Sequence, residues 1–170
     1  MNEITQSARL RIRLFRKNDA PFLLELLNSP EWLAMLESRH VKTIRDAKHY
    51  LKHFILKDYE QRQYGFYVLT LLENQCPIGL CGITLRKNHT IPDLGFGILP
   101  AYAGQGFILE AASVILNYIK ESLPLKTVDA FATIRNIASQ RILEKLDFKL
   151  QREIFHSTFQ VWVKHYQLKW

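Results

Sequence analysis

The sequence has little cysteine, no long apolar run and fewer acidic than basic residues, and each shortage excludes a class of protein. Two cysteines, Cys76 and Cys81, are too few for a disulfide framework, so we expect reduced thiols and a cytoplasmic setting. No apolar run approaches membrane-spanning length, and residues 1–9 are too polar for the core of a signal peptide. With no repeat, low-complexity tract or linker, residues 1–170 are expected to form one domain.

Lysine and arginine exceed aspartate and glutamate by 23 − 16 = 7 residues. Such an excess favours an anionic cofactor or an acidic partner such as a ribonucleoprotein, or it is simply a basic solvated surface. The basic residues do not form a stripe interleaved with aromatic residues, so we do not expect nucleic-acid binding. A hydrophobic content of 48% and a charged content of 23% are typical of a soluble globular protein.

Glycine is also infrequent, with seven residues, but Gly104 and Gly106 stand where a strand pattern changes to a helix pattern. Residues 93–98 alternate apolar and small residues, as in a half-buried strand, and Pro100 has no N–H to continue a ladder. Apolar residues then recur at helical spacing: Ile108, Ala112, Ile115, Leu116 and Ile119. The sequence therefore predicts a strand, a glycine loop and a helix that ends near Ser122.

A helix that begins in a glycine loop presents unsatisfied N–H groups and a partial positive charge, which together favour a phosphate. Two nucleotide-binding signatures are excluded here. The dinucleotide fingerprint needs a third glycine where Leu109 stands. The phosphate loop of ATPases needs lysine and serine or threonine where Phe107 and Ile108 stand. What remains is a pyrophosphate cradle made mostly of main chain.

Two segments resemble the GNAT superfamily of N-acetyltransferases. Residues 99–107, with the sequence Leu-Pro-Ala-Tyr-Ala-Gly-Gln-Gly-Phe, and the following Glu110 and Ala111 are similar to the acetyl-CoA loop of that family. Residues 135–148 resemble a segment of its ribosomal-protein N-acetyltransferase branch, which is RimJ/RimL-like. That branch has glycine where Asp147 stands, and aspartate tolerates the left-handed turn required there. The resemblance implies acetyl transfer from acetyl-CoA to an amine.

The resemblance and the patterns together predict an α/β protein with the GNAT, or acyl-CoA N-acyltransferase, fold. We expect a mixed (α+β) sheet of about seven mostly antiparallel strands, with a splayed parallel pair, and four helices. The strands are expected at residues 10–14, 66–72, 78–85, 93–98, 128–133, 148–155 and 159–168. The helices are expected at residues 22–27, after a capping box of Thr43 and Asp46, at residues 107–122, and after Asn136.

Two of these helices have specific predicted inward faces. In the helix after Thr43 the apolar stripe comprises Ile44, Ala47, Leu51, Phe54 and Ile55. In the helix after Asn136 it comprises Ala138, Ile142 and Leu146. His49 and His53 have the spacing of zinc ligands, but no third ligand accompanies them, so we expect no metal site.

The resemblance also implies which residues hold acetyl-CoA. The amides that hold the pyrophosphate would be those of Ala103, Gly104, Gln105, Gly106, Phe107 and Ile108. The main chain of Phe96, Gly97 and Ile98 would pair with the amides of the pantetheine arm, as a peptide adds to a strand edge. That edge exists only if this strand splays away from the strand at residues 126–133. Asn136 would contact the arm, cap its helix, or do both.

Acetyl transfer also needs a proton acceptor and a donor for the leaving thiolate. Many family members use a tyrosine as the acid, but Leu143 stands at that position. Ser139 is the alternative donor, unless its hydroxyl bonds its own helix backbone. Asp93 is the candidate base, unless it is a turn aspartate. Glu110 is expected to be a helix-start charge, and the proximity of the two substrates supplies much of the rate.

The sequence leaves the acceptor open. It is either a protein N-terminal α-amine or a small-molecule amine, and the protein is either a monomer or a homodimer. By the resemblance, Trp32, Arg39 and His40 either contact the acceptor or belong to the core and surface. Because the usual tyrosine is missing, the alternative function is a non-catalytic acyl-CoA-binding module.

Overall fold

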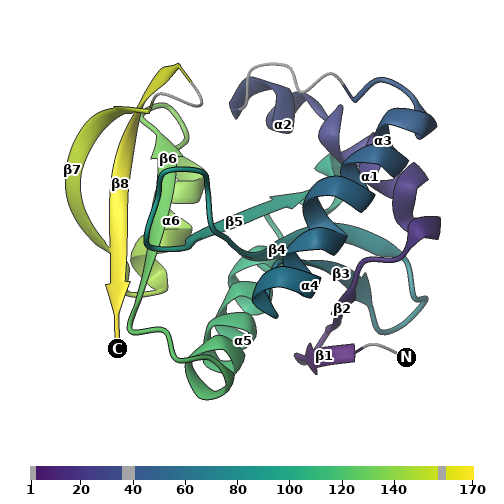
Figure 1. The fold of residues 1–170 in the computed structure, drawn as a ribbon, viewed down its shortest axis with the longest axis horizontal. Helices are drawn as coiled ribbons and strands as arrows, with labels where there is room; N and C mark the ends of the chain where they lie inside the picture. Colours follow the sequence, from purple (N-terminus) through teal and green to yellow (C-terminus); the bar gives the residue numbers. More distant parts are fainter. Residues whose placement is uncertain (1–2, 36–40, 157–159) are drawn as a thin grey trace.

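The computed structural model describes residues 3–35, 41–156 and 160–170, which form a mixed sheet flanked by helices (Figure 1). Arg39 and His40 lie outside the described residues. The sheet has eight strands within these ranges, in the order β1-β2-β3-β4-β5-β6-β8-β7. They are β1 (Glu3–Gln6), β2 (Leu10–Leu14), β3 (Phe66–Leu71), β4 (Pro77–Thr84), β5 (Asp93–Ile98), β6 (Thr127–Thr133), β7 (Lys149–His156) and β8 (Val161–Lys169).

The predicted mixed sheet with one parallel pair and flanking helices is confirmed, but the expected strand number was one too low. The additional strand is β1, a four-residue segment that pairs antiparallel with β2 at the sheet edge. Its sequence, Glu-Ile-Thr-Gln, is too short and too polar to show an apolar period. Within the described ranges, no helix has the length and apolar character that crossing a bilayer requires.

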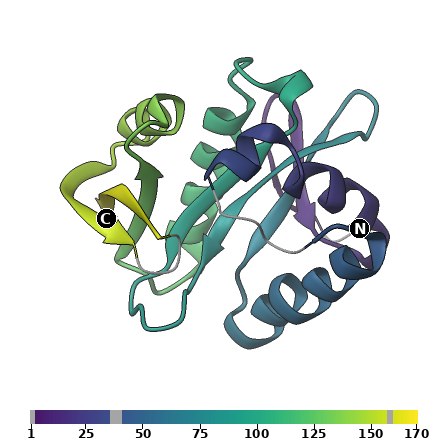
Figure 2. The ribbon, with the colours of Figure 1, turned by 90° about the horizontal axis from the view of Figure 1, so that it is seen from above.

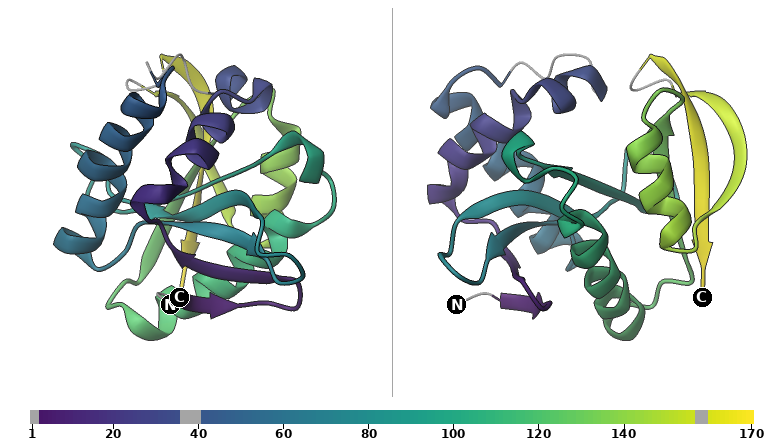
Figure 3. Two further views of the ribbon diagram at one scale, coloured as in Figure 1. Left: turned by 90° about the vertical axis from the view of Figure 1, so that its right-hand side faces the viewer. Right: turned by 180° about the vertical axis from the view of Figure 1, so that it is seen from behind.

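The helices cover the two faces of the sheet. They are α1 (Ala20–Leu27), α2 (Pro30–Met35), α3 (Ile44–Tyr50), α4 (Leu56–Arg62), α5 (Phe107–Ser122) and α6 (Ile137–Lys145). The helix α5 packs on one face of the sheet, where its predicted stripe is buried. The helices α1 and α3 bury a second cluster on the opposite face. The portion made by β6, β7, β8 and α6 stands at the other end of the sheet from α1–α4 (Figures 1 and 3).

The helix after Thr43 has its predicted start and most of its predicted face, since Ala47, Leu51 and Ile55 are buried. The Thr43 hydroxyl accepts from the Asp46 N–H at 3.2 Å, and Asp46 accepts from the Thr43 N–H at 2.9 Å, which confirms the capping box. A π-helical turn, Leu51–Ile55, joins α3 to α4. This wider turn puts residues four or five apart on one face, so Leu51 and Ile55 are buried while Phe54 is 56% exposed. Ile44, at the first turn, is also exposed.

The predicted inward face of the helix α6 is confirmed at Leu146, which is buried, but differs at the other two positions. Ala138 is exposed and Ile142 is only half-buried, whereas Gln140 and Leu143 are buried. Gln140 is buried because its amide is satisfied: it donates to the carbonyls of Thr133 and Ile134 at 3.0 and 2.9 Å and accepts from Lys164. Gln140, a polar residue with three hydrogen-bond partners, therefore occupies the buried face of α6 where the apolar pattern predicted Ala138.

The parallel pair at the centre of the sheet is short. β5 and β6 pair only at Asp93 with Asp129 and at Leu94 with Ala130. β5 then continues to Ile98 and β6 to Thr133, and the two strands diverge (Figure 1). The predicted splay is therefore confirmed.

Candidate active site

The glycine loop between β5 and α5 has the conformation that its glycines predict. A short 3₁₀ turn, Pro100–Tyr102, ends the strand, and Gly104 and Gly106 have φ angles of +75° and +82°. Other residues adopt such angles only with strain. A Cβ atom at Gly104 would meet no atom within 4 Å, so the loop is open on that side.

The N–H groups of this loop form a cradle, but one fewer of them is available than the sequence predicts. The Ala103 N–H donates to the Pro100 carbonyl at 3.1 Å and is therefore taken within the turn. The N–H groups from Gly104 to Ile108 have no acceptor in the part of the chain that the structure describes. The last of these belong to the first turn of α5, where the helix dipole adds a partial positive charge. Five consecutive donors thus remain for an anion.

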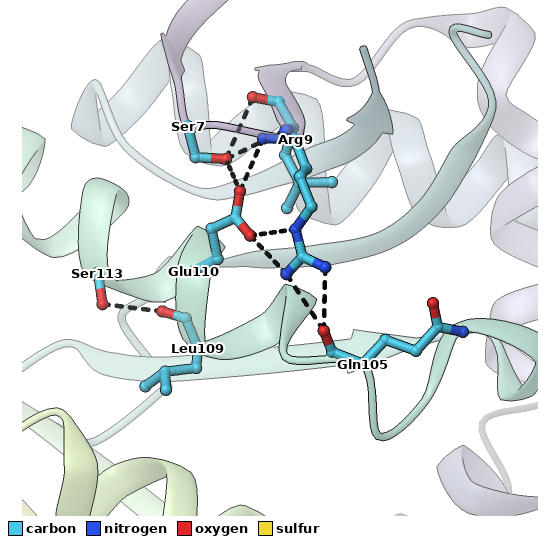
Figure 4. Close-up of polar contacts among 7 residues, drawn as sticks. Ser7, Arg9, Gln105, Leu109, Glu110 and Ser113 are labelled. Atoms are coloured by element: carbon cyan, nitrogen blue, oxygen red, sulfur yellow. Dashed lines mark hydrogen bonds and ion pairs between the residues drawn. The ribbon is translucent and has the colours of Figure 1, made fainter. Parts of the chain in front are cut away.

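Arg9, from the turn before β2, holds this loop from outside (Figure 4). Its Nη1 and Nη2 atoms donate to the Gln105 carbonyl at 3.1 and 3.2 Å, and its Nε donates to Glu110 at 2.7 Å. Its guanidinium also lies 4.2 Å from the centre of the Phe107 ring. The sequence shows Arg9 only as one of several alternating arginines, and its partners lie about a hundred residues further along the chain.

Glu110 acts as an anchor at the start of α5. Its carboxylate accepts from the Ser7 hydroxyl at 2.7 Å, from the Arg9 N–H at 2.8 Å and from the Arg9 guanidinium. Burial pushes the pKa of Glu110 upward, but the hydrogen bonds from Ser7 and Arg9 outweigh this and hold it below its ordinary value. These bonds fit the expected helix-start charge.

The divergence of β5 and β6 opens a cleft that is partly open to solvent. Gly95 and Phe96 form its β5 side, and the opposite side is formed by Asn136, which precedes α6, and by Ser139 and Leu143 of α6. The remaining walls are largely apolar: Leu27, Trp32, Tyr50, Ile55, Phe66, Leu80, Leu94, Phe131, Ala132 and Val163. The strand β5 leads from this cleft through Gly97 and Ile98 toward the glycine loop.

Trp32 of α2 joins the core to this cleft. Its side chain is only 8% exposed and packs in the cluster of α1 and α3, yet it also lines the cleft. A Cβ atom at Gly97 would lie 2.4 Å from the indole ring, so glycine is required for this close approach. Seen from above, α2 lies across the sheet (Figure 2).

Asn136 and Ser139, two of the predicted site residues, both line the cleft, but only the Asn136 side chain is hydrogen-bonded to the helix backbone. The Asn136 side chain accepts from the Ser139 N–H at 3.0 Å, which confirms the helix cap. The Ser139 hydroxyl makes no hydrogen bond within the described ranges. By contrast, Ser113 in α5 donates to the Leu109 carbonyl at 2.9 Å. The expected alternative of a backbone-bonded serine therefore describes Ser113 and not Ser139. Leu143 is buried in the same wall.

Asp93 lies at the base of the cleft in an ion pair that the sequence did not indicate. The Arg86 Nη2 atom donates to one carboxylate oxygen at 2.8 Å, and its Nε atom lies 2.8 Å from the other oxygen as an ion pair. The Asp93 side chain is almost fully buried, and this burial raises its pKa, while the charge and hydrogen bond of Arg86 act against the rise. Both residues line the cleft. Asp93 is thus more than a turn residue.

A cluster of histidine rings surrounds Phe131 on the β6 side of the splay. Phe131 stacks on His165 with ring centres 5.0 Å apart, and His156 and His89 meet it edge-on at 5.0 and 5.9 Å. His165 Nε2 lies 3.1 Å from an Asp129 oxygen. Burial, with the nearby charges of Arg86 and His89, lowers the pKa of His156 to about 4. The sequence did not predict this cluster.

The family model of the acetyltransferase (GNAT) domain matches residues 9–149. The chain belongs to the GNAT acetyltransferase family. Its general reaction is acetyl transfer from acetyl-CoA to an amine, and this GNAT protein is an N-acetyltransferase. A relative in Bacillus subtilis, described as "Uncharacterized N-acetyltransferase YoaA", is 23% identical over 150 residues, covering 88% of this chain and 84% of that protein.

Solved acetyltransferases share the fold of this GNAT protein. An acetyltransferase from Agrobacterium tumefaciens has a TM-score of 0.82 and 20% identity, covering 98% of this chain and 94% of that one. RimL, a ribosomal L7/L12 alpha-N-protein acetyltransferase in complex with coenzyme A, has a TM-score of 0.84 and 16% identity, covering 98% and 97%. The free N–H groups, the open face at Gly104 and the unpaired edge of β5 all fit acetyl-CoA in this GNAT protein.

Proposed function

We propose that this GNAT protein acetylates the α-amino group at a protein or peptide N-terminus, by direct attack on acetyl-CoA in a ternary complex. The observation that carries the proposal is the splay beyond Leu94, because it places an unpaired strand edge between the glycine loop and an apolar cleft. Acetyl-CoA supplies an activated thioester, and the chain supplies its binding and the handling of protons.

The cofactor would be held along β5 and the glycine loop. The N–H groups of Gly104, Gln105, Gly106, Phe107 and Ile108 hold the pyrophosphate, aided by the α5 dipole. The main-chain groups of Phe96 and Ile98 face the free edge of β5 and pair with the amides of the pantetheine arm, while Gly97 bonds to Leu80 of β4. Asn136, on the facing wall, contacts the arm as well as capping α6. An N–H at the splay polarises the thioester carbonyl.

The charge of the cleft favours an α-amine as acceptor. At pH 7.5, deprotonating an α-amine with a pKa of about 7.7–8.0 costs roughly 0.5 kcal/mol, against about 4 kcal/mol for a lysine-type amine with a pKa of about 10.4. Among the described lining residues the only carboxylate is that of Asp93, and Arg86 neutralises it. A polyamine with several positive charges would therefore find little compensation here.

Asp93 and Ser139 would handle the protons. A carboxylate oxygen bonded to Arg86 keeps a further lone pair, so Asp93 still accepts a proton from the amine, directly or through water. The C–N bond forms, the C–S bond breaks, and the Ser139 hydroxyl donates to the departing thiolate. Solvent returns a proton to Ser139, and Asp93 releases to solvent the proton that it took from the amine. Holding both substrates in one cleft supplies much of the acceleration.

A panel of acceptors tests this proposal. Peptides with free N-termini, the same peptides with blocked N-termini and one internal lysine, and a polyamine are each incubated with acetyl-CoA while thiol release and product mass are measured. We expect release and a mass gain only with the free N-termini. Acetylation of the lysine or the polyamine instead would refute the α-amine assignment. Cofactor binding without turnover on any member would support the non-catalytic module.

A further inference from the structure

We propose that Arg9 is a positioning residue that fixes the orientation of the peptide between Gln105 and Gly106, and so aims the loop N–H groups at the cofactor pyrophosphate. The inference rests on the proposed cofactor site. Arg9 lies in the N-terminal segment, far from the loop in sequence, and on this proposal the loop N–H groups point toward the pyrophosphate only when Arg9 is in place.

The first step is the geometry of one peptide group. Two guanidinium nitrogens of Arg9 converge on the Gln105 carbonyl (Figure 4). In a trans peptide the carbonyl and the following N–H point in opposite directions. Holding the Gln105 carbonyl toward Arg9 therefore directs the Gly106 N–H to the other side of the loop. If this peptide turned over, the cradle would present a carbonyl oxygen to an anion in place of a donor.

The second step is the rigidity of the guanidinium itself. Glu110 binds its Nε and Nη2 atoms, and the Phe107 ring lies against its face. Glu110 is fixed in turn by the Ser7 hydroxyl and by the Arg9 N–H. Both Phe107 and Glu110 belong to the first turn of α5, so the arginine ties the loop to the helix that follows it. Lysine, with a single ammonium group, cannot reproduce this fork.

The third step separates positioning from stability. The Arg9 side chain is 46% exposed, and exposed ion pairs contribute little to the free energy of unfolding. Gly106 lacks a side chain to bias its backbone, and its left-handed angle is one of many that glycine can adopt. The loop therefore needs a contact from another part of the chain, here Arg9, to keep one backbone conformation. Losing Arg9 should change anion binding more than it changes folding.

The test compares coenzyme A with pantetheine, which lacks the pyrophosphate and the adenosine 3′-phosphate attached to it, in direct binding titrations. The variants are Arg9→Ala, Arg9→Lys and, as a matched control, Arg11→Ala, whose arginine binds Glu3 and Gln75 instead of the loop. We expect Arg9→Ala to weaken coenzyme A binding roughly tenfold or more, the effect of one or two charge-assisted hydrogen bonds. Pantetheine binding should not change. Arg9→Lys should lie nearer to Arg9→Ala than to the unchanged protein, and Arg11→Ala should bind both ligands normally.

Three results would overturn the inference, and they can be told apart. If Arg9→Ala keeps the full preference for coenzyme A over pantetheine, Arg9 does not position the loop, while the cradle stands. If both ligands weaken equally, the role of Arg9 is only structural, and urea unfolding would show the matching loss of stability. If the unchanged protein itself binds the two ligands alike, the pyrophosphate cradle of the proposed function fails as well.

Discussion

Leu94 of β5 lies opposite Ala130 of β6, and this is the last pairing that the two parallel strands make. Beyond this pair, β5 and β6 no longer pair with each other, and the cleft opens between them. The residues that follow Leu94 are small or spaced by glycine, which permits Trp32 to pack directly on the backbone of Gly97. One point of divergence thus creates both the free edge and the apolar wall of the site.

Gly106→Glu should abolish coenzyme A binding, with a loss of about a hundredfold or more. A side chain at φ +82° costs roughly 1–2 kcal/mol, and the new carboxylate would also repel the pyrophosphate. Ala101→Glu places the same charge on the exposed 3₁₀ turn, outside the cradle, and should bind normally. Calorimetric titration measures both. Unchanged affinity in Gly106→Glu would refute the cradle.

Ser139→Ala should lower kcat by roughly ten- to a hundredfold and leave the KM for acetyl-CoA unchanged, because the hydroxyl is assigned to the leaving thiolate. Ser113→Ala makes the same change at a hydroxyl that bonds its own helix, and it should have no effect on turnover. If steady-state kinetics show full activity in Ser139→Ala, the acid is another group or water.

Asp93→Asn should reduce kcat/KM by roughly 10²–10⁴-fold, the range for loss of a general base. Because burial raises the pKa of Asp93, the unchanged protein should lose activity as the pH falls through a value above the usual one for aspartate. Asp129→Asn is the control, since Asp129 faces Asp93 in the ladder but pairs with His165 and Gln167. A pH–rate profile with the same acid limb in Asp93→Asn would exclude Asp93 as the base.

His156 should make the fold sensitive to acid. Its pKa is about 4 in the folded protein, against an ordinary value of 6.5, so below pH 6.5 the unfolded chain binds more protons. Its stabilising contribution is complete above pH 6.5 and is lost as the pH falls toward 4. His156→Phe keeps a ring beside Phe131 and cannot be protonated, so its thermal unfolding midpoint should fall less steeply over this interval. Parallel acid profiles for His156→Phe and the unchanged protein would show that another group is responsible.

The parts of the site that depend on local sequence could be predicted, and those that depend on distant partners could not. The positive φ angles of Gly104 and Gly106 and the helix cap made by Asn136 could be predicted, because each involves only residues that are close in sequence. Arg9 and Arg86 gave no such signal, since each is one arginine among many until the fold brings its carboxylate partner close. The strongest local signals therefore located the cofactor loop but not the side chains that hold it.

The same distinction explains the errors in the helices. Phe54 matches an apolar period that assumes a regular α-helix, and a π turn changes that period. Ala138 matches a helix face that Gln140 takes instead, because two backbone carbonyls and a lysine satisfy its amide. Neither the turn nor these partners can be predicted from residue polarity alone.

The most direct test of the whole account is amide hydrogen exchange with and without acetyl-CoA, resolved to single residues. The account predicts slower exchange in two separate places: at Phe96 and Ile98, whose N–H groups face the free edge of β5, and at residues 104–108 in the glycine loop. Protection of neither segment, at a concentration that saturates the protein, would contradict it.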